Sequence, residues 1–509
     1  MFSWSARGFA FEHMDYTGAV PSVHYQEIHQ QSTAAAYDAY GYRFTQLVTY
    51  QTTLAYTGPY VPTDSGVHRA QSYTPPINRL PAELLMLVFA RSVDCEVKEP
   101  YLAFLRSSCT PLVLARICSF WREVALATPV LWQQFALRPC RGVGHHYRIA
   151  QLFIERSRGH GLRVHYSEDA RFGGRPVECC PCSVGLILNN IGQIITLQLR
   201  EIRSATAARL AAVQPNSAVA MRHFFLSVHE DTLPHEVARS LSRLYCSPDL
   251  RVFLWDCTVP PIDVPWSQLI ALTLTQCSVD PGTFLDVVTY SPGLRDATIT
   301  FNRTPLDLAP RPAIRHHALE GLSIAGVGPL DWLLNHLHLP NLLHFTLDPA
   351  MGDAPESLGW PFHDISALFE FCGRLDRGLE SLAIVYSGIF RDSALLALIH
   401  LPQMSRLRLL QVVSSHVVAG NDLFMKLQPA GTLAPLLPYL EILKLECCVT
   451  TDGVISRMLQ ARHTQCYPLR VATLLYPEHY DVSHPVDMHA FERLRKRGIA
   501  ILWESSLGD

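Results

Sequence analysis

A group of cysteines and histidines between positions 140 and 182 could bind a metal ion. Three cysteines share the stretch "ECCPCS", and one cysteine and two histidines lie upstream: Cys179, Cys180, Cys182, Cys140, His145 and His146. Thiolates and imidazoles are ligands of zinc, but tetrahedral zinc is usually held by paired Cys-x-x-Cys knuckles. This spacing gives only a tight turn of thiols. We therefore expect incidental cysteines and no bound metal, with a metal protein or repeat-fold enzyme as the weaker alternative.

Other catalytic motifs are incomplete. "GVGHHY" from Gly142 and "GVGPLD" from Gly326 begin like dinucleotide-binding loops, but both lack the third glycine. "HEVAR" at His235 has no second histidine one helical turn later, as a zinc protease would need. The sequence contains neither a phosphate-binding Gly-x-x-x-x-Gly-Lys-Ser/Thr loop nor a Gly-x-Ser-x-Gly nucleophile elbow. We expect a protein that is not an enzyme and needs no cofactor.

Composition narrows the class of protein further. The 509 residues are 48% hydrophobic and 17% charged, which is enough apolar material for a large core. The net charge of -3 supplies no basic field for nucleic acid. Most of the 14 cysteines lie in apolar segments, which suits reduced thiols in the cytoplasm or nucleus. We find no secretory signal and no apolar run long enough for a bilayer, so we expect a soluble protein without a membrane partner.

The first region, residues 1–75, is rich in Tyr, Ser, Thr, Ala, Gln and Gly and poor in Leu, Ile and Val. Such a composition cannot bury enough apolar surface to offset the entropy of ordering. It predicts a disordered tail.

The elements that follow read as short helices. "LPAELLMLVF" predicts a helix to about Val93, with Pro81 at its first position and Glu83 near its positive end. Its large apolar residues cover more of the helix than one core-facing stripe of about 100° requires. Either the protein wraps this helix completely or part of its surface is kept for a partner.

"PLVLARICSFWREVALAT" predicts a second helix, and "PVLWQQFAL" continues the apolar cluster through Trp132 and Phe135. One buried face of the second helix is expected to carry Leu114, Ile117, Cys118, Trp121 and Val124.

These two segments together resemble an F-box. The matching positions run in order through both helices to the closing Leu-Trp: Leu80, Pro81, Glu83, Leu84, Leu85, Val88, Phe89, Leu112, Leu114, Ile117, Cys118, Trp121, Arg122, Leu131 and Trp132. The chain departs from the family by a long insertion, "DCEVKEPYLAFLRSSCT", between the helices. Long insertions there are familiar in the F-box proteins expanded in fungi.

The resemblance implies binding to a Skp-type adaptor and, through it, to a cullin-based SCF ubiquitin ligase. The excess apolar surface would be a helix-in-groove contact. The expected adaptor contacts are Leu80, Pro81, Leu84, Leu85, Val88 and Phe89, with Leu114, Ile117 and Trp121 holding or extending the patch. Some of these must pack the interior of the module, and the sequence does not divide them.

A loose repeat, apolar-x-x-apolar-x-apolar, occupies the rest of the chain. Its clearest copies are "LIALTLTQC" from Leu269 and "LEILKLECC" from Leu440, and the copies begin roughly 19 to 37 residues apart. The other copies begin at Ile194, Met221, Leu250, Leu294, Leu319, Leu342, Leu379, Leu407 and Leu469. The pattern resembles degenerate leucine-rich repeats, whose short strands stack because no unit can bury its apolar face alone. "AFERLRKRGIAILW" predicts a last helix and strand, with the basic run Arg493, Arg495, Lys496 and Arg497 as its solvated face rather than a nuclear signal.

The predicted fold is therefore α/β: a disordered tail over 1–75, an all-α F-box over 76–138 and an irregular leucine-rich-repeat solenoid over 139–509. The predicted function is a substrate receptor of the ligase, with the repeats binding a target protein. The alternative is an F-box and repeat scaffold without a role in ubiquitination. On the concave face we expect Thr273, Thr275, Asp296, Thr298, His344, Asp348, Lys444 and Glu446 to be exposed for target binding. Loops that bind the target instead remain an equal alternative.

Overall fold

The protein is described here from a computed structural model. The structure describes residues 36–37, 43–44, 76–94, 110–139, 145–168, 181–229, 233–301, 311–326, 330–348, 366–385, 392–413, 419–429, 435–446, 448–476 and 484–505. The chain divides into two units, Met1–Arg79 and Leu80–Asp509.

The first unit contains few described residues. Strands β1 (Ala36–Tyr37) and β2 (Arg43–Phe44) form an antiparallel pair, and the short 3-10 helix η1 spans Pro76–Arg79. The pair was not predicted, since the sequence of this region has no sustained strand period. The rest of the predicted disordered tail lies outside the described residues.

The described residues of the second unit open with three α-helices and a 3-10 turn. These are α1 (Ala82–Asp94), α3 (Thr110–Ile117), α4 (Ser119–Ala127) and η2 (Pro129–Trp132). The carbonyl of Pro81 accepts a hydrogen bond from the backbone N–H of Leu85, so the helix starts one residue after this proline. The predicted second helix is two helices. Cys118 between them has an extended backbone, and its Sγ accepts a bond from the N–H of Trp121, which caps α4.

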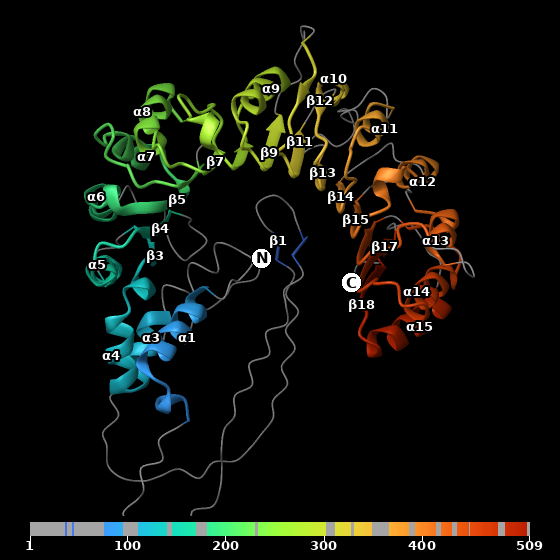
Figure 1. Ribbon diagram of the computed structural model, residues 1–509, viewed down its shortest axis with the longest axis horizontal. Helices are drawn as coiled ribbons and strands as arrows, with labels where there is room; N and C mark the ends of the chain where they lie inside the picture. Colours follow the sequence, from blue (N-terminus) through green and yellow to red (C-terminus); the bar gives the residue numbers. More distant parts are fainter. Residues whose placement is uncertain are drawn as a thin grey trace, which may run out of the picture. The chain divides into compact units, whose positions relative to one another are not determined.

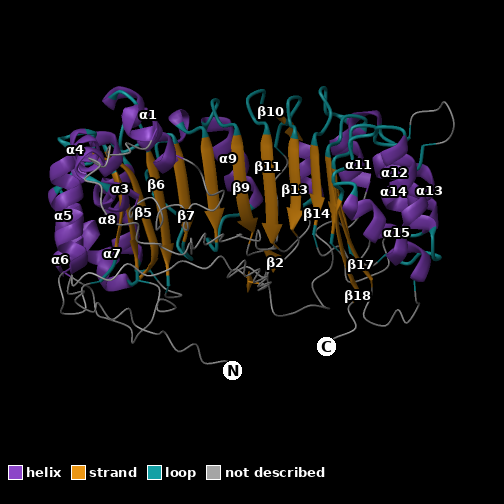
Figure 2. Ribbon diagram, turned by 90° about the horizontal axis from the view of Figure 1, so that it is seen from below, coloured by secondary structure: helices purple, strands orange, loops and turns teal. Residues whose placement is uncertain are grey.

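A parallel sheet of fourteen strands follows, and its strand order is the order of the chain from β3 to β18 apart from β10 and β12. The strands are β3 (Gln134–Leu137), β4 (Leu162–Ser167), β5 (Ile194–Ile202), β6 (His223–Val228), β7 (Val252–Asp256), β8 (Ala271–Thr275), β9 (Asp296–Phe301), β11 (Gly321–Gly326), β13 (His344–Asp348), β14 (Ser381–Ile384), β15 (Leu409–Val412), β16 (Ile442–Leu445), β17 (Val471–Tyr476) and β18 (Ala500–Ser505). Figure 2 shows them side by side and pointing the same way. All eleven copies of the repeat pattern lie on strands of this sheet.

Helices connect most of these strands and cover one face of the sheet (Figure 1). They are α5 (His145–Ser157), α6 (Pro181–Asn189), α7 (Ser204–Ala211), α8 (His235–Tyr245), α9 (Pro281–Tyr290), α10 (Asp331–His336), α11 (Ser366–Gly373), α12 (Asp392–Ile399), α13 (Asn421–Leu427), α14 (Val454–Thr464) and α15 (Pro485–Lys496). Two further short strands, β10 (Ile314–Arg315) and β12 (Leu337–His338), form a separate parallel pair. We call the face of the sheet that these helices leave uncovered the open face. No described helix has the length and apolar character to cross a membrane.

The core lies between the sheet and the helices because side chains alternate along each strand. In β8, Leu272 and Leu274 are buried while Ala271, Thr273 and Thr275 are half-buried on the open face. The cross-strand register aligns the buried apolar residues of neighbouring strands: Leu272 pairs with Ala297, and Ala297 pairs with Leu322. Each unit thus completes the apolar core of its neighbour, as in a solenoid-like fold.

The boundary between the helical segment and the sheet lies earlier than predicted. Strand β3 falls within the range assigned to the F-box, yet it pairs with β4 in the fourteen-stranded sheet. Trp132, just before it, donates from Nε1 to the carbonyl of Ala125 and packs edge-on against Phe153 of α5. The first helices are therefore fastened directly to the first strand. The predicted insertion spans residues 94–110. Its first residue, Asp94, ends α1 and its last, Thr110, begins α3, and residues 95–109 lie outside the described residues.

Candidate functional site

Helix α1 has a buried apolar side and an exposed apolar side. Leu85 and Phe89 are 0% and 1% exposed, and the ring of Phe89 packs 4.9 Å from that of Trp121. Leu84, Leu87 and Val88 are exposed, and Leu87 is 63% exposed. Residues three and four apart share one side of a helix, so these three side chains form a single outward face. A helix that needed only to pack against its own protein would carry polar residues there.

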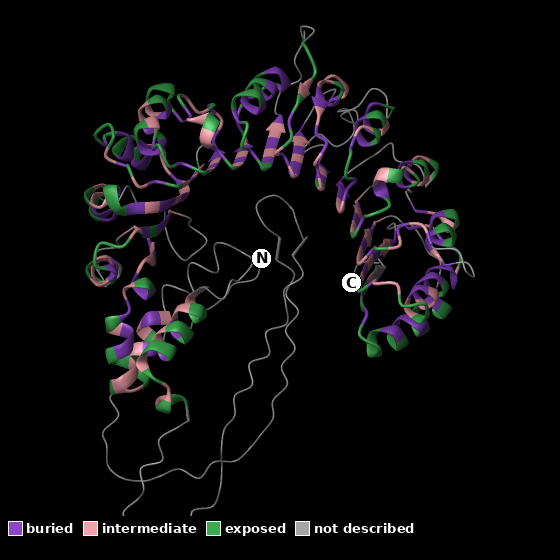
Figure 3. Ribbon diagram, viewed as in Figure 1, coloured by how far each residue is buried: buried purple, intermediate pink, exposed green. Residues whose placement is uncertain are grey.

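Helix α3 repeats this arrangement. Pro111 and Leu114 are buried, whereas Val113 and Ile117 are exposed at positions four apart. Helices α1 and α3 are in contact. Figure 3 shows both buried and exposed stretches on these helices. We call the exposed apolar side chains Leu84, Leu87, Val88, Val113 and Ile117 the outer apolar face.

The structure divides the predicted adaptor contacts into two groups. Leu84, Val88, Pro81 and Ile117 are exposed, and Leu80 and Trp121 are half-buried. Leu85 and Phe89 are buried in the core of the helical segment, so their predicted exposure as adaptor contacts is wrong. Leu114, which was expected to hold or extend the patch, is buried as well.

Sequence reasoning missed Leu87 and Val113, the two most exposed members of the outer apolar face. The signal for Leu87 was present, because it lies three positions after Leu84 on the same side of the helix.

The predicted target-binding residues lie on the open face of the sheet. Thr273 pairs with Thr298 across β8 and β9, and Lys444 pairs with Gln411 and Thr473 on its two sides. Thr275, Asp296, His344 and Glu446 hold matching positions, and Asp296 and His344 are exposed. Asp348 shares their side of the strand but is 5% exposed, so its predicted exposure is wrong. Alternation along a strand predicts the side of a residue, not how deeply its neighbours cover it.

Buried polar groups on the same face are held by hydrogen bonds. The carboxylate of Asp256 accepts bonds from Ser227 Oγ at 3.0 Å and Thr275 Oγ1 at 2.6 Å. His165 is buried, with Nδ1 3.1 Å from Gln198 Oε1. Burial lowers the pKa of His165 to about 4, and the charges of Arg200 and Arg138 lower it further against the opposing bond from Gln198. This imidazole is therefore neutral near pH 7.

Asp452, His484 and Asp487 form a compact polar cluster, and one potential ligand atom from each lies within 4.8 Å of the others. Their oxygens are already engaged. Asp452 accepts from the N–H groups of Val486 and Asp487, and Asp487 accepts from that of Ser456. Asp452 thus caps the N-terminus of α15 and fastens it to α14. We assign this cluster to packing of the last repeat.

The predicted thiol cluster is only partly visible. Cys182 is exposed in α6, and Cys140, Cys179 and Cys180 lie outside the described residues. The eight described cysteines are free thiols. Burial raises the pKa of Cys277 and of Cys372 to about 12, as expected for thiols that serve only as packing groups.

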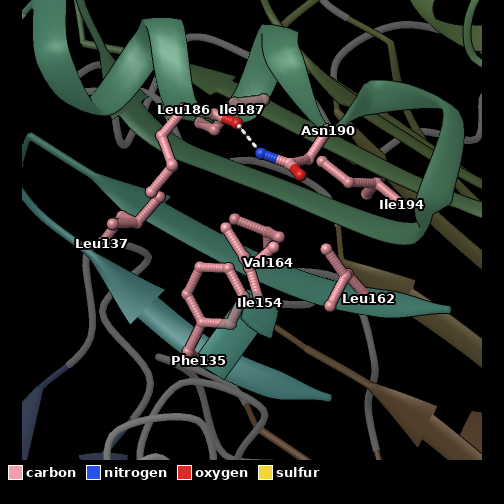
Figure 4. Close-up of a pocket in the computed structure, with 9 residues that line it drawn as sticks. All are labelled: Phe135, Leu137, Ile154, Leu162, Val164, Leu186, Ile187, Asn190 and Ile194. Carbon is pink, nitrogen blue, oxygen red and sulfur yellow. Dashed lines mark hydrogen bonds between the residues drawn. The ribbon is translucent and has the colours of Figure 1, made fainter. Parts of the chain in front are cut away.

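A small hollow lies between β3, β4 and β5 and helices α5 and α6 (Figure 4). Its lining is apolar except for Asn190, whose amide donates to the carbonyl of Leu186 at 2.8 Å. With its polar group already bonded, this hollow offers no group to orient a substrate. We interpret it as a small packing gap between the sheet and the helices.

A comparison with known proteins finds no family model and no curated protein that matches this chain.

Proposed function

We propose that this protein is the substrate-recognition adaptor of an SCF-type ubiquitin ligase. In this proposal the outer apolar face of α1 and α3 docks on a Skp-type adaptor, and the sheet receives a target protein. The proposal rests on the likeness of the helical segment to an F-box and on the position of that segment at one end of a long parallel sheet. The chain would contribute no catalytic group. It would raise the effective concentration of the target beside the ubiquitin-carrying enzyme.

The single observation that carries the proposal is the split of α1 into a buried and an exposed apolar face. Large apolar side chains exposed together on one helix are unusual unless a partner covers them. Their spacing of three and four residues is the one that an amphipathic helix uses to fill a hydrophobic groove. The arginines Arg91 and Arg116 are also exposed and lie three residues after Val88 and Val113. This gives the face a charged border, as protein interfaces usually have.

The first prediction tests this face. Leu84→Asp combined with Leu87→Asp should abolish binding of a purified Skp-type adaptor, because burying unpaired carboxylates in an apolar contact is costly. Both residues are exposed in the free protein, so the double variant should fold with an unchanged unfolding midpoint. Phe89 is unsuitable for this test because it is buried. Adaptor binding is measured by pull-down and calorimetry.

The matched control is Met425→Asp combined with Met488→Asp. These methionines are also exposed on helices, α13 and α15, and are 54% and 52% exposed. The control variant should bind the adaptor like the wild type. Wild-type binding by the folded Leu84 and Leu87 variant would refute the proposed docking face. If the complex forms but supports no ubiquitin transfer in a reconstituted ligase, the protein is a scaffold instead.

A further inference from the structure

Three arginines and a histidine lie near the starts of strands β4, β6 and β7, which β5 joins into one continuous part of the sheet. Arg163 is the second residue of β4, His223 is the first residue of β6, and Arg222 and Arg251 directly precede β6 and β7. All three arginines are exposed and His223 is half-buried. We call these four residues the arginine strip.

The sheet register brings the strip together. Arg163 pairs with Thr196 of β5, and Thr196 pairs in turn with His223. The backbone N–H of Arg251 donates to the carbonyl of Arg222 at 2.7 Å, which fixes the two residues side by side. Thr196 Oγ1 lies 2.9 Å from Nδ1 of His223. If this hydroxyl donates to Nδ1, the Nε2–H of a neutral His223 remains a donor for a ligand.

Within the described part of the chain, no carboxylate forms an ion pair with any of the three arginines. Arg251 makes one side-chain bond, to the carbonyl of Gln268. The charges of the arginines act on His223: its pKa is lowered mainly by burial and further by the charges of Arg163 and Arg222.

The same positions in later repeats are neutralised. Arg408, Glu441 and Arg470 directly precede β15, β16 and β17. Arg408 Nε donates to Glu441 Oε1 at 2.8 Å, and the charge of Arg470 also acts on Glu441. Arg408 and Arg470 thus both have the carboxylate of Glu441 near them. The strip differs by lacking one.

We propose that the arginine strip binds an acidic segment of the target protein, a run of Asp and Glu that crosses the strands from β4 to β7. This inference rests on the proposed function, whose target surface it locates. Three strand-to-strand steps span about 14 Å, and acids on alternate residues of an extended peptide lie about 7 Å apart. Such a peptide can reach all three arginines, whereas a single phosphate group is too small to do so. Charge complementarity of this kind fixes partner choice and speeds association.

The test uses the full chain and a fluorescein-labelled peptide of alternating Asp and Ser, with fluorescence anisotropy as the readout. Wild-type protein should bind the peptide, and added salt should weaken binding. Arg163→Ser combined with Arg222→Ser should weaken it about tenfold and reduce the salt dependence. A peptide with Asn in place of each Asp should not bind.

The matched control is Arg408→Ser combined with Arg470→Ser, which removes the same charge from the same edge of the sheet. It should bind the acidic peptide within about twofold of the wild type, because a cation beside an acid contributes little to capture of a second acid. Equal losses in the two double variants would overturn the inference by showing an effect of net charge alone. Tighter binding of a singly phosphorylated Ser-Asn peptide than of the acidic peptide would overturn it in favour of a phosphate site.

Adaptor binding by the same variants separates this inference from the proposed function. Arginine-strip variants that bind both adaptor and peptide like the wild type would overturn the inference and leave the function standing. A wild-type chain that binds the acidic peptide but no adaptor would overturn the function and leave the strip as an acidic-peptide site.

Discussion

His165 is a buried ionisable residue whose protonation links the stability of the protein to pH. It lies on the open face of β4 with a pKa lowered from 6.5 to about 4, mainly by burial. Between these two values the unfolded chain takes up a proton and the folded chain does not. Stability present above pH 6.5 is therefore lost as the pH falls toward the folded pKa.

The second prediction follows from this linkage. In the window from pH 6.5 to about 4, His165→Gln should remove about 3 kcal/mol of the pH-dependent loss of unfolding free energy. Urea unfolding of wild type and variant across that window measures the difference, and the carboxylates common to both proteins cancel. If the unfolding free energies of the two proteins instead change in parallel across this window, the pKa of His165 is not lowered in the folded state.

At the residue scale, the sequence predicted an excess of apolar surface on α1 but not which side chains form it. Helical periodicity places Leu84 and Leu87 on one side and Leu85 and Phe89 on another. Only the packing of α1 against α4 and η2 decides which side is covered. Phe89 was expected to be a contact through the resemblance to an F-box, yet its ring packs against that of Trp121 inside the module. Pairing information from the fold was needed to choose correctly.

At the scale of elements, Arg462 of α14 joins neighbouring repeats. It is 0% exposed, and its guanidinium donates to three backbone carbonyls. These belong to Leu427 at the end of α13 and to Leu436 and Leu437 before β16. Leu437 has a positive φ of 55°, a conformation that disfavours branched or bulky residues unless neighbours hold it. The arginine thus fixes a turn that the local sequence would not maintain.

The third prediction is that Arg462→Met lowers the free energy of unfolding by about 3 kcal/mol, because buried carbonyls lose their donors. The free energy of unfolding of Arg462→Lys should lie between those of Arg462→Met and the wild type, since one ammonium cannot match the planar fork of a guanidinium. Arg497→Met, at an exposed arginine just after α15, should change stability little. Urea unfolding monitored by circular dichroism gives all three values. Equal stability of Arg462→Met and Arg497→Met would mean that water replaces the lost bonds.

The sequence predicted the positions of most strands but not the boundaries between elements. Each apolar-x-x-apolar-x-apolar copy lies on a strand because alternation needs only local sequence, as in "LTLT" of β8. The break between α3 and α4 was missed because apolar spacing continues through Cys118. The extended backbone of Cys118 interrupts the helix, and its Sγ accepts a hydrogen bond from the N–H of Trp121 that caps α4. Strand β3 was assigned to the helical cluster because "QFAL" is short and its partner, β4, lies beyond α5. Strands β10 and β12, two residues each, carry no periodic signal at all.

At the scale of the whole molecule, the second unit contains two parts to which we assign different tasks. A helical segment with the outer apolar face precedes a sheet in which neighbouring repeats build the core together. The expectation of an α/β fold with a large parallel sheet is confirmed, whereas the identity of its repeats as leucine-rich repeats and the ligase role remain proposals. The repeat spacing is widest between the copies that begin at Leu342 and Leu379, yet strands β13 and β14 of these copies pair directly.

The most direct test of the central claim is hydrogen–deuterium exchange of the full chain with and without a saturating amount of purified Skp-type adaptor. We predict slower exchange in the peptides that cover α1 and α3, because a bound partner suppresses local opening of the helices it contacts. Exchange in strands β4 to β17 should not change. Unchanged exchange in α1 and α3, or protection confined to the sheet, would contradict the assignment of the outer apolar face to the adaptor.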